Sequence, residues 1–231
     1  MKSRDKRKYF FSHLIEGFLS IPKIVYFNFS VLPIKQAIKF PVIISHRIQL
    51  RGINSKTIKI NGKKGFASIR IGFGASRFSV ECSRKGLISV ENGLIEIGER
   101  TGLSEGVILD AKNAKICLGK HFRCNYASII AAENDDIIFG NEVVLGWRVN
   151  IRNTDGHHIV ENGTPKKNHK TIIVGNHVWI CSHSHILKGA KIGNDSVVGY
   201  GSLVTKSFTN PNVLLAGWPA KIIKQSINWE E

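Results

Sequence analysis

The 231-residue sequence has no long uncharged hydrophobic run. In the N-terminal part, through Lys64, the longest stretch without a charged residue lies between Lys23 and Lys35, far short of the roughly 20 residues with which an α-helix crosses a bilayer. The opening MKSRDKRK resembles the basic start of a signal peptide, but His13 and Glu16 interrupt the apolar stretch and no small-residue cleavage site follows. We therefore expect neither a transmembrane helix nor a signal peptide.

Cysteine is scarce and unpaired. The sequence contains no C-x-x-C pair and too few cysteines for a disulfide framework: Cys82, Cys117, Cys124 and Cys181. This usage fits a reducing compartment. We interpret the four side chains as small apolar fillers.

Acidic residues are scarce in the N-terminal part of the chain. Through Lys64 there are fourteen Lys and Arg residues and two acids, whereas the remaining 167 residues hold nineteen against fifteen. Such a basic segment favours an anionic partner, either nucleic acid or phospholipid headgroups. The apolar stretches YFF, IVYFNFSVLPI and FPVII lie between the basic residues and favour lipid over nucleic acid. Residues 1–57 are thus predicted to be a helical, basic, amphipathic segment that lies on an anionic membrane. A small helical subdomain packed on the main body is the alternative.

What the sequence does have is a repeat of six residues. The clearest series of apolar residues at intervals of six is Val174, Ile180, Ile186, Ile192, Val198 and Val204. Mostly small residues stand two positions before each, and Gly175, Gly193 and Gly199 follow three of the six. Upstream, triplets that start at residues 97, 118 and 139 continue the pattern: Ile97, Leu103, Leu109, Leu118, Cys124, Ile130, Phe139, Leu145 and Ile151.

A period of six indicates a parallel β-helix, in which each hexapeptide is one short strand plus a corner and three of them close a triangular coil. The aliphatic residues point into the prism, and glycine permits the backbone conformation of the corner. We predict an all-β domain over residues 58–208, with irregular first coils between residues 58 and 95. Residues 209–231 are predicted to form a cap with a short helix, since AGWPAKIIK contains a Pro-started turn.

Two longer motifs add a family resemblance. The stretches IIVGNHVWICSHSHILKGAKIGNDSVVGYGSLVTKSF and LLAGWPAKIIK resemble the hexapeptide-repeat acyltransferases, and within them the O-acetyltransferases of bacterial surface-polysaccharide synthesis. The resemblance covers roughly residues 85–225. It implies a left-handed β-helix, a homotrimer and acetyl-CoA as donor, with no metal. The acceptor would be a sugar hydroxyl of a surface polysaccharide or of its lipid-linked precursor. The expected location is the cytoplasm, at the inner face of the cell membrane, with no nucleic-acid partner.

The repeat is interrupted once at length, over residues 152–173, and this excursion contains NTDGHHIVENG. A prism side is flat, so a loop that leaves it is a natural wall for a pocket. In the family, a His in a T/S-D-x-H loop at this place is the catalytic base, and the matching residue here is His157. Asp155 or Glu133 is predicted to orient its imidazole, although Asp155 also suits a turn before Gly156. The candidate acceptor-binding residues are His158, Asn125 and Arg148.

The family match also suggests a donor site. Trp179 and Ser182 are expected near the pantetheine and thioester, with the Ser182 N–H as an oxyanion donor. Cys181 replaces the usual Gly of the VWIG motif, which puts the close backbone approach at that corner in doubt. The remaining candidates lie along the coenzyme arm or at its phosphates: Tyr200, Gly201, Lys206, Lys221 and Lys224.

Two other functions stay open at this point. A zinc hydro-lyase on the same architecture would need three converging imidazoles. His177, His183 and His185 are suggestive in number, but His177 and His183 are expected on successive prism faces, where side chains diverge. A non-catalytic, membrane-bound scaffold is the other alternative. Together with His169, these three histidines are expected on the outer surface.

Overall fold

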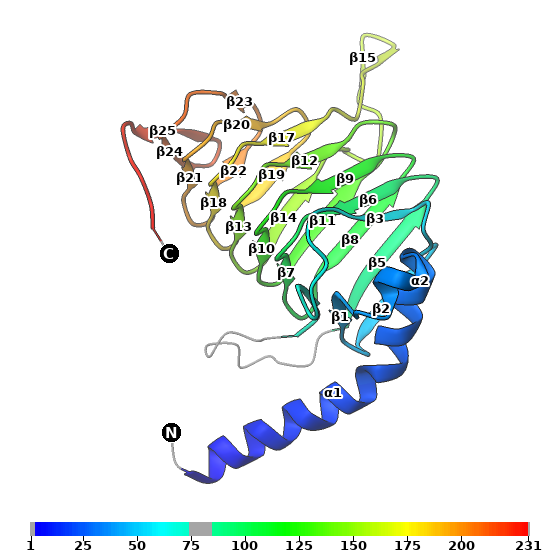
Figure 1. Cartoon of the computed structure of the whole chain (residues 1–231). Coiled ribbons are helices and arrows are strands. Elements are labelled where there is room, and N and C mark those ends of the chain that lie inside the picture. Colours follow the sequence, from blue (N-terminus) through cyan, green and yellow to red (C-terminus); the bar gives the residue numbers. More distant parts are fainter. Residues whose placement is uncertain (1–2, 74–84, 231) are drawn as a thin grey trace.

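The computed structural model describes residues 3–73 and 85–230. Most of the chain winds into a prism whose three sides are parallel β-sheets (Figure 1). Helix α1 spans Ser3–Val31 and α2 spans Ile34–Ala37. No helix in the described ranges is long and apolar enough to cross a membrane. Cys82 and part of the predicted irregular coils lie outside these ranges.

Each coil contributes one strand to each side of the prism. Sheet I consists of β1 Val42–Ile44, β4 Ile69–Ile71, β7 Gly102–Leu103, β10 Arg123–Cys124, β13 Val144–Leu145, β18 Trp179–Ile180, β21 Val197–Val198, β24 Leu214–Gly217 and β25 Ala220–Lys224. Sheet II consists of β2 Ile48–Arg51, β5 Gly86–Glu91, β8 Ile108–Lys112, β11 Ala127–Ala131, β14 Val149–Arg152, β19 His185–Leu187 and β22 Leu203–Val204. Sheet III consists of β3 Ile58–Ile60, β6 Leu94–Ile97, β9 Lys115–Leu118, β12 Ile137–Phe139, β17 Ile172–Val174, β20 Lys191–Ile192 and β23 Ser207–Phe208. We call the corners where sheets I and II meet edge I/II, and those where sheets II and III meet edge II/III.

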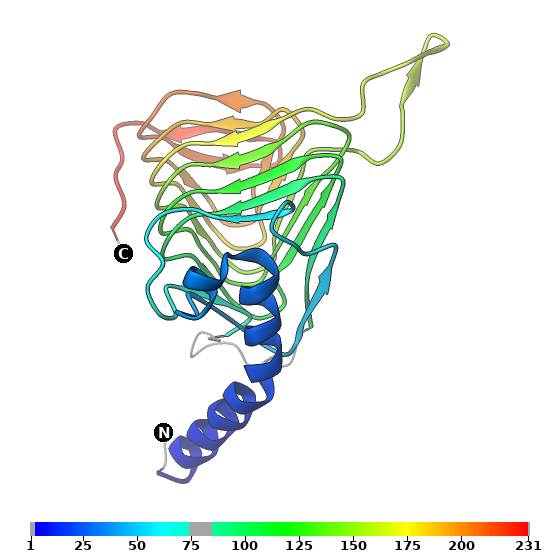
Figure 2. The same cartoon turned by 45° about the vertical axis from the view of Figure 1, so that its right-hand side comes forward.

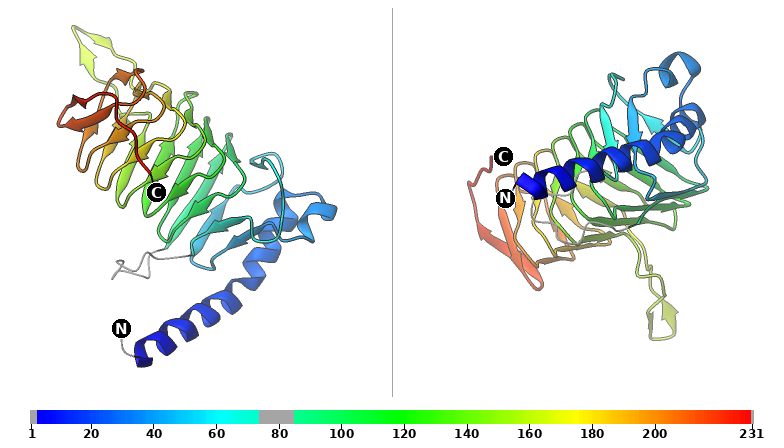
Figure 3. Two further views of the ribbon diagram at one scale, coloured as in Figure 1. Left: turned by 60° about the vertical axis from the view of Figure 1, so that its left-hand side comes forward. Right: turned by 90° about the horizontal axis from the view of Figure 1, so that it is seen from below.

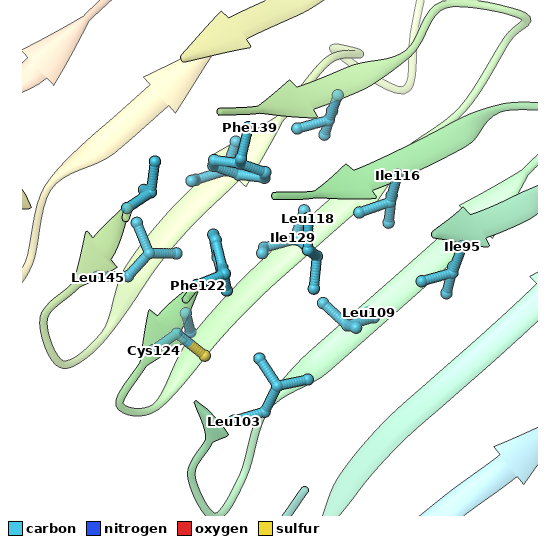
Figure 4. Close-up of a cluster of buried hydrophobic side chains, with 14 of the residues drawn as sticks. Ile95, Leu103, Leu109, Ile116, Leu118, Phe122, Cys124, Ile129, Phe139 and Leu145 are labelled. Carbon is cyan, nitrogen blue, oxygen red and sulfur yellow. The ribbon is translucent and has the colours of Figure 1, made fainter. Parts of the chain in front are cut away.

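The six-residue period corresponds to the buried interior of the prism. All six residues of the clearest series are at most 3% exposed. Figure 4 shows the same stacking lower in the prism, where Leu103, Cys124 and Leu145 follow one another along sheet I. Desolvation raises the pKa of the Cys124 thiol to about 12. Cys124 therefore acts as a small apolar filler, as expected.

One predicted inward position is wrong by a single residue. Ile129, not Ile130, points inward, and it aligns with Leu109 in one neighbouring strand and Ile151 in the other. The inward positions Leu103 and Leu109 are six residues apart, whereas Cys124 and Ile129 are five apart. The corner after β10 is thus one residue shorter than its neighbours. A strict period of six assumes corners of equal length, so it predicts Ile130 instead of Ile129.

The glycines of the repeat serve a different purpose from the one predicted. Gly175, Gly193 and Gly199 do not adopt positive φ. A Cβ on Gly175 would instead lie 2.4 Å from Asn194 Oδ1, and a Cβ on Gly193 would lie 2.4 Å from the carbonyl oxygen of Asn210. Glycine is therefore needed there because successive corners approach closely, not because the turn needs a left-handed backbone.

Two predicted boundaries also need correction. The β-helix begins with β1 and β2, not at residue 58, because these strands pair in parallel with β4 and β5. The C-terminal cap is not helical: β24 and β25 form an antiparallel hairpin. The edge of β24 offers free backbone partners, and the β-branched Ile222 and Ile223 favour a strand that uses them.

Helix α1 covers the open end of the first coil. Asn28 accepts a hydrogen bond from the backbone N–H of Val42 (3.2 Å) and donates to its carbonyl (2.7 Å). Lys23 Nζ donates to the carbonyls of His46 and Ile48, both at 2.6 Å. The helix thus satisfies backbone groups of the first strands that no further coil would reach.

Candidate active site

The predicted excursion is an arm that projects from edge II/III (Figure 2). It leaves at Arg152, where β14 ends, and returns at Ile172, where β17 begins. Strands β15 (Val160–Glu161) and β16 (Thr164–Pro165) form an antiparallel hairpin near its tip. Every residue from 155 to 167 is exposed, so no other part of the described ranges covers the outer arm.

The root of the arm is firmly attached to the coil below. Asn153 is fully buried, and its amide donates to the carbonyls of Ala132 (3.0 Å) and Asp135 (2.5 Å) while accepting from the Ala132 N–H (2.9 Å). The Lys170 N–H, on the returning limb, donates to the Asn153 carbonyl at 2.9 Å. The outer arm is therefore held on a fixed base.

Asp135 adds a charged contact to this base. Its carboxylate accepts hydrogen bonds from Thr171 Oγ1 (2.8 Å) and contacts Lys167 Nζ (3.0 Å) and His169 Nδ1 (2.6 Å). Desolvation raises the pKa of Asp135, but the hydrogen bonds from Thr171, Lys167 and His169 outweigh it and lower the pKa to about 2. The ionised carboxylate thus binds the returning limb of the arm.

Asp135 and His169 form a pair that the sequence alone does not identify. They are 34 residues apart, so only the pairing of the arm with the coil below brings them together. The available signal was the acidic pair Asp135–Asp136, which follows a strand at the same edge from which the arm leaves. His169 is partly exposed and lies off the inward register, as predicted.

The two candidate orienting carboxylates lie apart from His157. Asp155 forms an ion pair with Lys188 of the next coil. Glu133 is exposed in the corner after β11, where it has a φ of 65°. Among the described residues, no contact joins either carboxylate to His157. In this conformation neither therefore orients the imidazole.

His157 and His158 occupy different settings on the arm. His158 Nδ1 lies 3.1 Å from the carbonyl oxygen of Lys166 on the opposite limb. His157 is exposed, and no hydrogen bond of the described part of the chain involves its ring. The first histidine of the pair is thus presented outward, while the second contacts the arm itself.

Several other candidates lie together on edge I/II. The Arg148 N–H donates to the Tyr126 carbonyl (2.6 Å), and the Gly201 N–H donates to the Ser182 carbonyl (3.0 Å). Asn125 and Tyr200 lie in the same stacked corners. The hydrogen bonds of the described residues leave the Ser182 N–H without a protein acceptor, so it suits the predicted role of an oxyanion donor.

A hollow of about 230 Å³ opens on this edge, where the corner after β10 is one residue short. It is lined by Tyr126, Ala127, Ser128, Arg148, Val149 and Asn150. Drug-sized ligands occupy pockets of roughly 300–1,000 Å³, so this hollow would hold only part of a ligand. The predicted acceptor-binding residue Arg148 is in its wall.

The donor candidates are spread over neighbouring surfaces. Trp179 is 40% exposed on the outer side of sheet I, where the ring centroid of Trp229 lies 6.0 Å away. Desolvation raises the pKa of the Cys181 thiol to about 11, which disfavours its thiolate form. The three lysines are exposed, but they do not converge: Lys206 lies at edge II/III, and Lys221 and Lys224 lie on β25.

The candidate base and the candidate binding residues therefore lie on different edges. His157 belongs to edge II/III, whereas Arg148, Ser182 and Tyr200 belong to edge I/II. Strand β14 separates the two edges with four residues, or about 13 Å at 3.3 Å per residue. The chain does not bring the two halves of the predicted site together by itself. No group of three potential metal ligands occurs in the described ranges.

Comparisons with known proteins agree with this architecture. The family model for the bacterial transferase hexapeptide (six repeats) matches residues 171–206. A galactoside O-acetyltransferase from Escherichia coli K12 is 33% identical over 115 residues, which are 48% of this chain and 55% of that protein. A polysialic acid O-acetyltransferase from Neisseria meningitidis is 45% identical over 103 residues, covering 44% and 48%. The chain thus spans about half the length of these curated relatives.

A solved structure extends the likeness of fold over most of the chain. The polySia-specific acetyltransferase NeuO superposes with a TM-score of 0.62 at 22% identity, covering 82% of this chain and 72% of that one. The prism is accordingly the left-handed parallel β-helix that the family resemblance implies.

Proposed function

We propose that the chain is an acetyl-CoA-dependent O-acetyltransferase of the hexapeptide-repeat type, whose family model matches residues 171–206. Its acceptor is a sugar hydroxyl of a bacterial surface polysaccharide or of its lipid-linked precursor. The observation that carries this proposal is the arm, which presents His157 of the TDGH motif outside an otherwise flat prism. The names of the relatives, which are O-acetyltransferases of galactosides and polysialic acid, support the substrate class.

His157 acts as the general base in this proposal. A sugar hydroxyl is a weak nucleophile, and a positioned base that removes its proton accelerates the attack by typically 10²–10⁴-fold. The hydroxyl oxygen attacks the thioester carbonyl carbon, and the imidazole takes the hydroxyl proton. The oxyanion accepts a hydrogen bond from the Ser182 N–H. When the carbon–sulfur bond breaks, the imidazolium returns the proton to the thiolate, which leaves as free coenzyme A. This sequence needs no metal and no covalent enzyme intermediate.

The site is completed between two copies of the chain, as expected of a homotrimer. The arm of one copy reaches edge I/II of its neighbour and places His157 beside the neighbour's Arg148 and Ser182. Two observations support this arrangement. The arm carries the exposed apolar residues Ile159 and Val160 (66% and 60% exposed), and Tyr200 on the other edge is 72% exposed. Exposed apolar groups on both surfaces favour a contact that buries them.

The activity is tested by incubating the protein with acetyl-CoA and candidate sugars, free or lipid-linked, and measuring the release of coenzyme A thiol. Release that depends on the sugar, together with an acetylated product, is the expected result. Hydrolysis of acetyl-CoA without acetylated sugar would contradict the proposal. Tight zinc binding with no acetyl transfer would favour the hydro-lyase alternative.

The shared site is tested by mixing two inactive variants. His157→Ala lacks the base on the arm, and Arg148→Ala lacks the proposed acceptor contact on edge I/II. If the site lies between copies, refolding the two variants together restores activity, because some sites then combine an intact arm with an intact edge. If each site lies within one chain, no mixture contains an intact site and activity stays absent.

We also propose that the protein works at the surface of the membrane that carries its acceptor. The basic N-terminal part of the sequence supports this location.

A further inference from the structure

The outward side of α1 is apolar over four turns. Among the side chains from Ile15 to Val31, every exposed residue is apolar, aromatic or proline: Ile15, Phe18, Leu19, Ile21, Pro22, Val25, Tyr26 and Phe29. Phe18 is 74% exposed, more than the other large hydrophobic side chains of this group. We call this surface the outer face of α1.

Both charged residues of this stretch point the other way. Glu16 is buried and accepts a hydrogen bond from Ser45 Oγ at 3.0 Å. Lys23 donates to the carbonyls of His46 and Ile48, and burial lowers its pKa. The helix therefore turns its charges toward the protein and its large apolar side chains toward the solvent, the reverse of a surface helix that faces water.

Apart from the ring of Phe40, whose centroid lies 6.3 Å from that of Phe29, no described residue is known to cover the outer face. The helix extends away from the prism at the end opposite to the arm (Figure 3). The apolar surface continues onto α2, where Ile34 is 71% exposed and Ile38 is 58% exposed. An apolar surface of this extent marks a site of interaction.

Basic residues flank the apolar surface on both sides. The sequence before it, from residue 2 to residue 8, contains five Lys and Arg residues and one acid. Lys35 and Lys39 are exposed next to Ile34 and Ile38. A second copy of this surface would bring like charges together, whereas anionic headgroups would neutralise them while the acyl boundary takes up the apolar side chains.

We propose that the outer face of α1 lies in the headgroup region of an anionic bilayer, with the flanking lysines on lipid phosphates. The arm then stands at a distance from the lipid. Sheet II places β14 four strand spacings above β2, or about 19 Å at 4.8 Å per spacing. If the proposed transferase function holds, the acceptor hydroxyl belongs to a glycan that extends from the membrane rather than to the headgroup itself.

Flotation with vesicles tests this proposal without reference to activity. The full-length protein is mixed with phosphatidylcholine vesicles with or without phosphatidylglycerol. The double variant Phe18→Ser/Val25→Ser removes apolar surface at two exposed positions. Lys35→Gln/Lys39→Gln removes only charge. Ile223→Ser makes the same kind of change at a 56% exposed position on β25, at the opposite end of sheet I from β1, and serves as the control for binding.

We expect the wild type and the Ile223→Ser control to float with anionic vesicles and not with neutral ones. Phe18→Ser/Val25→Ser should bind the vesicles at least about tenfold more weakly at every salt concentration, because burying a large apolar side chain contributes favourable free energy to binding. Lys35→Gln/Lys39→Gln should bind more weakly only at low salt, where charges are poorly screened. Thermal unfolding must show that the variants keep the wild-type fold.

Either of two results overturns the proposal. The first is a wild type that ignores anionic vesicles or a Phe18→Ser/Val25→Ser variant that binds them like the wild type. The second is a lipid-free assembly that dissociates in this variant, which would make the outer face of α1 a contact between copies. Flotation does not measure acetyl transfer, so a failed transferase assay would neither support nor contradict the membrane proposal.

Discussion

Ile186 and Ile159 carry the same side chain in opposite environments. Ile186 lies inside the prism with no exposure, whereas Ile159 lies on the arm and is 66% exposed. The inward stack is regular, and its members align with their equivalents in the neighbouring coils. The arm has no repeat, and its root depends on particular polar contacts of Asn153 and Asp135. The comparison indicates that the stack carries the stability of the fold, whereas the chemistry that we propose lies on the arm.

The largest effect should follow from removing the proposed base. His157→Ala should lower kcat by about 10²–10⁴-fold with little change in acetyl-CoA affinity, because a base acts on the proton in transit and not on ground-state binding. Steady-state kinetics and calorimetric titration with coenzyme A separate the two quantities.

A matched control for this variant is Glu161→Gln, an exposed position farther out on the same arm. It should retain wild-type activity and unfold at the same denaturant concentration as His157→Ala. Equal loss of activity in both variants would mean that the arm responds to any change, and the specific role of His157 would be lost.

A substitution in the inward stack should instead reduce the stability of the fold. Ile186→Ala should lower the free energy of unfolding by about 2–5 kcal/mol, because it removes buried methyl groups and leaves a cavity. Ile138→Ala, at a 36% exposed position on the outer side of sheet III, should cost clearly less. Urea unfolding measures both variants. Equal losses would show that inward packing does not dominate the stability of the prism.

The same contrast explains which features could be predicted from the sequence. The stack repeats its environment every coil, so its period identifies the β-helix and most inward positions. The register fails where one residue is missing before Ile129, because the deletion lies in a corner with no apolar pattern. The prediction of a helical cap is wrong because the backbone partners that β24 offers to β25 depend on the fold, not on the local sequence.

The candidate site is less accessible to sequence reasoning. The arm was found because the period stops there, but its attachment was not, since Asp135 and His169 meet only through the folded chain. The family motif selects His157, yet it gives no sign that Asp155 pairs with Lys188 instead. The sequence also could not show that the candidate base and the candidate binding residues occupy different edges of one prism.

An intermediate effect is expected at the root of the arm, where Asp135 is a positioning residue. Asp135→Asn should lower kcat more than it changes the KM for acetyl-CoA, because a loosened root misplaces His157. The neighbouring Asp136→Asn is the matched control, since Asp136 accepts a hydrogen bond from the Lys115 N–H (2.9 Å) and not from an arm side chain. If the two variants have the same kcat, the root does not position the base.

The difference in unfolding free energy between the wild type and the Asp135→Asn variant should depend on pH in a defined direction. The folded-state pKa of Asp135 is lowered to about 2, so its ionised form stabilises the fold above the ordinary carboxyl pKa. This contribution is lost as the pH falls from about 4 towards 2. The gap in unfolding free energy between wild type and Asp135→Asn should therefore be constant above about pH 5 and narrow below it. A gap that widens on acidification would contradict this assignment.

The smallest effect is expected at the second histidine of the arm. Successive side chains of an extended segment point in opposite directions, and His158 already contacts the Lys166 carbonyl at 3.1 Å. His158→Ala should therefore change kcat by less than about tenfold, since a neutral hydrogen bond at an exposed site contributes only about 1 kcal/mol. A moderate rise in the KM for the acceptor would fit its proposed place in acceptor binding. The two alanine variants must be compared with the same sugar. If His158→Ala is inactive while His157→Ala still turns over, the base is the second histidine, and the arm presents to its neighbour the side that here lies against Lys166.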